Sequence, residues 1–182
     1  DFAVLGSAQI EALTTVGVTG MTGSQLGVLG TTAAGGLSGA QVGVLVSSQV
    51  AALGNAVVGS LSTVQISSVT TGAVAGLTVS QFGVLGSTQV GGLTTGQVEV
   101  FSGEQIAALT SSAVRGLGSA QMGVLTSGDV AAFEDVDFGT LNTAQLSSVT
   151  TGAVAGITVS QIGVLGSTQL GGLMTGQVGV LS

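Results

Sequence analysis

The chain has 182 residues, with 33 Gly and no Pro, Cys, His, Trp or Tyr. One basic residue, Arg115, stands against eight acidic residues, which gives a net charge of −7. This composition leaves no imidazole base, thiolate nucleophile, Lys Schiff base or soft metal site. Nucleic-acid partners are also unexpected, because neutralising phosphates requires Lys and Arg. We therefore expect a protein that is not an enzyme and that has no cofactor.

Apolar residues are abundant, and the mean hydropathy is +0.76. Gln, Ser, Thr or Gly interrupts every apolar run within a few residues, so no run of about 18 apolar residues exists and no membrane span is expected. The absence of Cys fits an extracellular fibre. Residue 1 falls inside a repeat, and we expect a fragment of a longer chain that lies outside the cell or at its surface.

An eight-residue repeat runs through residues 1–182 without insertion or deletion, and all fourteen glutamines fall on one of its positions. Four residues after each of these positions stands a large apolar residue. The pattern predicts one continuous solenoid segment of about 23 octads with the apolar residues in its core. The expected core includes Leu53, Leu61, Leu85, Leu93 and Leu165, and the repeat glutamines include Gln65, Gln81, Gln89, Gln145 and Gln161.

The spacing inside one octad favours a short helical turn. Two apolar positions stand three residues apart, as in Val90 and Leu93, and such residues share one face of a helix but lie on opposite faces of a strand. A Ser, Thr or Asn three residues before Gln has the spacing of a helix capping box. In chain order, we expect such capped turns after Thr22, Ser38, Ser62, Thr78, Thr94, Ser102, Asn142 and Thr158.

The alternative fold is a β-solenoid with corners. The segment from Gln41 to Val44 alternates like a strand, and glycines such as Gly91 and Gly92 weaken a helix. Close approach of neighbouring coils would explain these glycines without strands, because it leaves no room for a β-carbon. The predicted fold is therefore a superhelix of stacked, capped helical turns, with the β-solenoid as the alternative.

Two longer periods overlie the octads. Residues 61–102 and 141–182 match at 33 of 42 positions, so an 80-residue unit is duplicated. Every 40 residues Ala replaces Gln, and a Gly follows three residues later. Five octads would form two superhelical turns of 20 residues or some other closed count. We interpret the missing Gln as a place where the outside of the rod meets a bulky group or a neighbouring rod; duplication without selection is the alternative. The alanines are Ala33, Ala73, Ala113 and Ala153, and the glycines are Gly36, Gly76, Gly116 and Gly156.

The only acidic cluster lies near the duplication boundary. Its carboxylates, from Asp129, Glu134, Asp135 and Asp137, form a calcium candidate by ligand type, but a solvated charged patch is the favoured interpretation. Pairs such as Thr94-Thr95 recur just after the core leucine. They could form a hydroxyl ladder that binds ice or a surface glycan, although their phase already explains them as helix caps.

Segments such as Leu61-Ser-Thr-Val-Gln65-Ile and Leu93-Thr-Thr-Gly-Gln97-Val show the consensus most clearly. This consensus resembles the Leu-Thr-Thr-x-Gln-Val/Ile octapeptide arrays of very large proteobacterial exoproteins, described as adhesion-like or haem-utilisation-like surface proteins. The chain departs from these arrays in having more Gly and Val where they have Ala and Gln. The haem label has no support from the residues, because His, Tyr and Cys are absent.

Together these features predict a non-enzymatic structural protein. We expect a segment of an extracellular bacterial fibre, adhesin stalk or surface filament whose main partner is another copy of itself. The alternative is an ice-binding or carbohydrate-binding solenoid that uses a Ser/Thr ladder.

Overall fold

The computed structural model describes residues 2–181, and every regular element in this range is helical. The helical solenoid is therefore confirmed, and the β-solenoid alternative is wrong. Each α-helix begins two residues before the repeat position and spans four to six residues. None of these short helices has the length and apolar character needed to cross a membrane.

The elements, from the first α-helix onward, begin at eight-residue intervals. They are η1 (Phe2–Val4), α1 (Ser7–Glu11), α2 (Thr15–Thr19), α3 (Gly23–Gly27), α4 (Thr31–Ala34), α5 (Gly39–Val42), α6 (Ser47–Ala52), α7 (Asn55–Ser60), α8 (Thr63–Ser68), α9 (Thr71–Val74), α10 (Val79–Phe82), α11 (Ser87–Gly92), α12 (Thr95–Val98), α13 (Gly103–Ala107), α14 (Ser111–Gly116), α15 (Ser119–Met122), α16 (Ser127–Ala132), α17 (Asp135–Phe138), α18 (Thr143–Ser148), α19 (Thr151–Val154), α20 (Val159–Val164), α21 (Ser167–Gly171) and α22 (Thr175–Val178).

The octad of α8 shows why each helix is so short. Ser62 has extended backbone angles (φ −70°, ψ 164°), and its side-chain oxygen accepts a hydrogen bond from the Gln65 N–H, which starts the helix. After little more than one turn the Val69 N–H bonds back to the Ile66 carbonyl, and the backbone at Val69 (φ −60°, ψ 128°) has left the helical region. The core residue therefore ends one helix and leads directly into the cap of the next.

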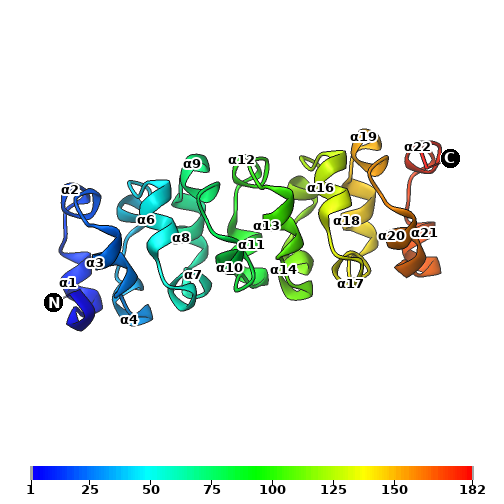
Figure 1. Cartoon of the computed structure of the whole chain (residues 1–182). Helices are drawn as coiled ribbons and strands as arrows, with labels where there is room; N and C mark the ends of the chain where they lie inside the picture. The colour runs from blue at the N-terminus through cyan, green and yellow to red at the C-terminus, as the bar shows by residue number, and fades with distance from the viewer. Residues whose placement is uncertain (1, 182) are drawn as a thin grey trace.

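The helices wind into an elongated rod with the chain termini at opposite ends (Figure 1). Each helix packs against the third helix before and after it, as α8 packs against α5 and α11. Close backbone approaches between coils join residues 25 and 29 apart, such as Gly91 with Gly116 and Gly116 with Ser87. One coil thus holds about 27 residues, between three and four octads, and not 20 residues. The 80-residue duplication spans about three coils.

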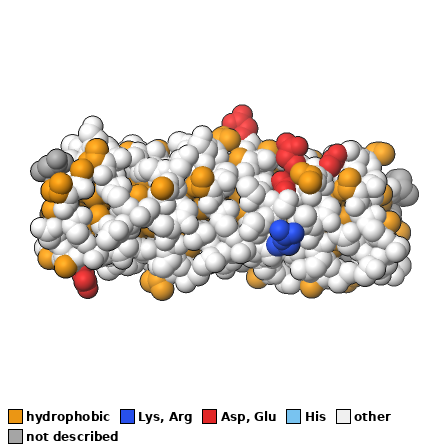
Figure 2. All heavy atoms as spheres, turned by 90° about the horizontal axis from the view of Figure 1, so that it is seen from below, with side chains coloured by type: hydrophobic (Ala, Val, Ile, Leu, Met, Phe, Trp, Pro, Cys, Tyr) orange, Lys and Arg blue, Asp and Glu red, His pale blue; other side chains and the backbone are white. Residues whose placement is uncertain are grey.

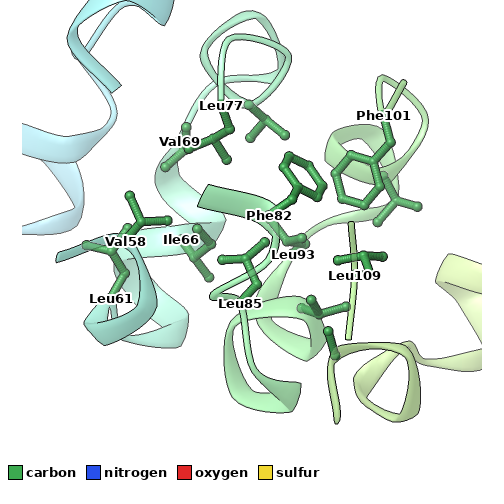
Figure 3. Packing of buried hydrophobic residues seen from close by; sticks show 14 of the residues in the cluster. Val58, Leu61, Ile66, Val69, Leu77, Phe82, Leu85, Leu93, Phe101 and Leu109 are labelled. Carbon is green, nitrogen blue, oxygen red and sulfur yellow. The ribbon is translucent and has the colours of Figure 1, made fainter. Parts of the chain in front are cut away.

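Apolar side chains from all coils form one continuous core between Ile10 and Leu165. Leu53, Leu61, Leu85, Leu93 and Leu165 are buried in it. Figure 3 shows core residues of successive octads pointing toward one another, with Phe82 and Phe101 edge to face at a centroid distance of 4.8 Å. An octad contributes only two large apolar residues, so its burial depends on the coils on either side.

Glycine is required at four equivalent positions, 40 residues apart. A β-carbon at Gly36, Gly76, Gly116 or Gly156 would overlap an atom of Ser7, Ser47, Ser87 or Ser127, respectively, on the preceding coil. Other glycines, such as Gly163 and Gly171, would meet nothing within 4 Å. Close coil approach therefore explains the 40-residue glycines but does not explain all of the glycines in the helices.

The expectation that the alanines in place of Gln lie on the outside of the rod is wrong. Ala33, Ala73, Ala113 and Ala153 are buried, as is the Gln of most other octads. The physical reason is that this position lies at the contact between coils. Where Ala replaces Gln, no long side chain stands between the two coils, and the backbone can come close at the glycine three residues later.

A matched pair of glycine substitutions tests this packing. At Gly156 a β-carbon would overlap the Ser127 carbonyl group, whereas at Gly152 it would meet nothing within 4 Å. We expect Gly156→Ala to lower the free energy of unfolding by about 1–3 kcal/mol through overpacking. Gly152→Ala, inside α19, should raise it by up to about 1 kcal/mol. Chemical denaturation measures both, and equal effects of the two substitutions would contradict the close approach.

Candidate functional site

The repeat glutamines form the most regular polar arrangement in the molecule. Each Gln is the third residue of its helix, and its side-chain Oε1 accepts a hydrogen bond from the backbone N–H of the cap residue three positions earlier. All fourteen glutamines make this bond, at 2.6–3.1 Å. It forms even where the cap is Val46, Gly86 or Met174, whose side chains cannot cap a helix. Of the two bonds of the capping box, the one made by Gln is therefore present at every Gln, whereas the one made by the cap side chain is not.

The other end of the same amide bridges to the preceding coil. In Gln81, Nε2 donates to the carbonyl oxygens of Val50 at 3.0 Å and Leu53 at 2.8 Å. All twelve glutamines from Gln41 onward donate to the carbonyl 28 residues earlier, at 2.6–2.9 Å. Gln9 and Gln25 have fewer than 28 residues before them and make the capping bond. One carboxamide thus satisfies backbone groups on two coils.

These bonds link into columns along the rod. The peptide group between Leu117 and Gly118 donates its N–H to Gln121 and accepts at its carbonyl from Gln145. Side-chain amides and backbone peptides alternate in this way through Gln97, Gln121, Gln145 and Gln169. Polarised amides in series strengthen one another. No buried side-chain nitrogen or oxygen in residues 2–181 lacks a hydrogen-bond partner.

The columns are interrupted where the repeat position is not Gln. At Ala73, between α6 and α9, the surface opens into a cleft of about 350 Å³ that is lined by residues 43–47 together with Thr70, Gly72 and Ala73. In the octads that contain Gln, its side chain extends from this position toward the preceding coil. Sequence reasoning missed this cleft, because it depends on which coil lies below Ala73.

The acidic residues do not form a shared site. Asp129 takes the Gln position of α16, and its Oδ2 accepts from the Thr126 N–H at 2.8 Å. Asp137 is buried and accepts a hydrogen bond from the Ser111 hydroxyl, while Asp135 accepts from the Ser160 hydroxyl. Glu134 is exposed at the cap of α17. Among the described residues, no group of three or more carboxylates is arranged to hold a metal ion.

The hydroxyl pairs have divided roles. The first Thr of the pair caps its helix, as Thr70 Oγ1 accepts from the Ala73 N–H at 3.2 Å and Thr150 Oγ1 from the Ala153 N–H at 3.2 Å. The second Thr, at Thr71 and Thr151, is exposed. On the face drawn in Figure 2 most side chains are small and uncharged, apolar side chains are spread along the rod, and most of the acidic side chains lie along one edge.

Comparison with known families places one part of the chain. Residues 104–134 match the ALTTAQ repeat. This match begins at Glu104 in α13 and ends at Glu134, so it covers consecutive octads of the rod, among them those of Gln105 and Gln121. A search of curated proteins finds no similar sequence.

Replacing a bridging glutamine should be more damaging than replacing a capping one. In Gln81→Met the side chain keeps its length, but the Thr78 N–H and the Leu53 carbonyl lose their partners inside the rod. We expect a loss of about 2–4 kcal/mol in the free energy of unfolding. The control Gln25→Met removes a capping bond that is exposed and should lower it by less than about 1 kcal/mol. Urea denaturation compares the two; similar losses would show that the bridge to the preceding coil contributes little.

Calcium should not affect the stability of the rod. Three of the four candidate carboxylates accept from different hydroxyl or backbone groups, and the fourth, that of Glu134, is exposed. We therefore expect the same midpoint of thermal unfolding with excess Ca²⁺ and with EGTA. Circular dichroism at about 222 nm follows helix loss. A calcium-dependent rise of several degrees would contradict this and would indicate a cation site.

Proposed function

We propose that this chain is a segment of a non-catalytic structural rod, part of an extracellular bacterial fibre, adhesin stalk or surface filament that associates with copies of itself. The observations that carry this proposal are the continuous core and the glutamine bonds that join successive coils, as in the column through Gln97, Gln121, Gln145 and Gln169. Each added coil offers the next coil the same carbonyl oxygens and the same apolar face. Such an architecture suits a structural role that requires length and stiffness better than it suits a role that requires one binding pocket.

The surface supports side-by-side association. Exposed large apolar residues, such as Val84 and Val164, occur along the whole rod, and the face drawn in Figure 2 shows no single large apolar patch. The remaining surface consists mainly of Gly, Ala, Ser and Thr, whose short side chains allow two rods to approach closely. With one basic and eight acidic residues, the rods carry a modest like-charge repulsion that salt would screen.

The match to the ALTTAQ repeat supports the repeat character of residues 104–134, on which the proposed rod depends. The cell-surface location is proposed from the resemblance of the octads to those of large exoproteins and from the absence of Cys. A rod held together by buried amides and aliphatic groups needs no disulfide or metal to fold.

A repetitive ligand such as ice or a surface glycan is the second candidate. Helices α6, α9 and α12 stack on one another, and so do α16, α19 and α22. Their starts carry one or two Ser or Thr residues each, in segments 46–48, 70–72, 94–96, 126–128, 150–152 and 174–176. Figure 1 places these helices along one edge of the rod.

Electron microscopy and sedimentation test the structural proposal. We expect negatively stained protein to form rods that align side by side. The sedimentation coefficient should rise with protein concentration and with salt, because salt screens the repulsion between acidic rods. The double variant Val84→Asp/Val164→Asp should weaken association by replacing two exposed apolar side chains with charges.

A charge-matched control separates the loss of apolar contact from the added repulsion. Thr88→Asp/Thr168→Asp adds the same two charges at exposed positions that are also 80 residues apart, and it should weaken association less. Monodisperse single particles of the unaltered chain at every concentration and salt would contradict self-association. Thermal hysteresis of dilute protein under those conditions would favour the ice-binding alternative instead.

A further inference from the structure

The octad of Ala73 keeps the backbone groups that bind a carboxamide but lacks the carboxamide. In the octad of Gln97, Oε1 accepts from the Thr94 N–H at 2.7 Å and Nε2 donates to the Val69 carbonyl at 2.6 Å. The equivalent groups at Ala73 are the Thr70 N–H and the Leu45 carbonyl. Within residues 2–181 neither of these two groups has a hydrogen-bond partner.

Both groups lie at an open cleft. Leu45, Thr70 and Ala73 line its wall, and its volume of about 350 Å³ has room for a small molecule as well as solvent. The Thr70 hydroxyl accepts from the Ala73 N–H, and its own proton remains available to a ligand. The Ser62 hydroxyl uses its proton in this way, donating to Gln65 Oε1 at 3.0 Å.

The group that a Gln side chain would add at Ala73 can be named chemically. A Gln side chain exceeds that of Ala by a CH₂–CO–NH₂ group, which corresponds to acetamide. No ionisable residue lines the cleft, so a neutral ligand is favoured over a carboxylate or an ammonium ion. An amide with an NH₂ group can both accept from Thr70 and donate to Leu45.

We propose that the cleft at Ala73 is a binding site for a primary carboxamide. The ligand carbonyl accepts from the Thr70 N–H and hydroxyl, and its NH₂ group donates to the Leu45 carbonyl, as the Gln side chains do elsewhere in the rod. The carboxamide is supplied by a small free amide or by an Asn or Gln side chain of a peptide. This proposal is independent of self-association.

The duplication repeats the residues of the site 80 residues later. Residues 123–127 repeat the Gly-Val-Leu-x-Ser pattern of residues 43–47, and Thr150 and Ala153 correspond to Thr70 and Ala73. The Thr150 hydroxyl accepts from the Ala153 N–H as in the first site. We therefore expect two equivalent sites, 80 residues apart.

Amide-detected NMR of the whole chain tests the proposal. Titration with acetamide should give saturable shifts of the Thr70 and Thr150 amide signals, and N,N-dimethylacetamide and acetate at the same concentrations should not. Ala73→Gln/Ala153→Gln, which fills both sites from within, should weaken acetamide binding at least tenfold. The control Ala40→Gln adds the same group at an exposed position of α5 and should leave binding unchanged.

A second NMR titration distinguishes a free small amide from a peptide side chain as the ligand. Acetyl-Gly-Asn-Gly-N-methylamide is compared with the same peptide containing Asp. Shifts with both acetamide and the Asn peptide support a side-chain ligand, and shifts with acetamide alone support a free small amide. Absence of saturable shifts with acetamide, or equal shifts with dimethylacetamide, would overturn the proposal, and neither comparison depends on the variants being folded.

Discussion

The structure depends on one side-chain amide that bonds to two backbone segments of the same chain. A helix of four to six residues leaves at least as many backbone groups without intrahelical partners as it pairs, so helix propensity alone cannot sustain it. The Gln amide accepts from the start of its own helix and donates to the end of a helix on the preceding coil. Aliphatic contacts hold the coils together, but they tolerate sliding, and the bond to the carbonyl 28 residues earlier fixes the register.

The local part of this arrangement can be predicted from the sequence. The three-residue spacing of Ser62 and Gln65 identifies the start of a helical turn, and the eight-residue spacing of leucines identifies the face toward the axis. Both signals depend only on residues close to one another in sequence, so they can be recognised without knowing how the coils stack. The helical fold follows from them, in spite of glycines such as Gly91 that argue against helix in isolation.

The contacts between coils could not be predicted in the same way. No single octad encodes that a coil holds about 27 residues. Three features follow from the number of residues in a coil. They are the bond of Gln81 to the Leu53 carbonyl, the burial of the glutamines and the cleft at Ala73. The acidic cluster illustrates the same limit, because Asp135 and Asp137 are neighbours in sequence but bond to serines on different helices, α20 and α14.

The shared direction of the columns has a mechanical consequence. Every bridging amide ties a coil to the one before it, so tension applied at the two ends of the rod acts on the coils in series. The coils would then unfold one after another, and each unfolding step would release a length of extended chain. Such a rod would extend stepwise under load and would refold after release as the glutamine amides bond to their carbonyl partners again.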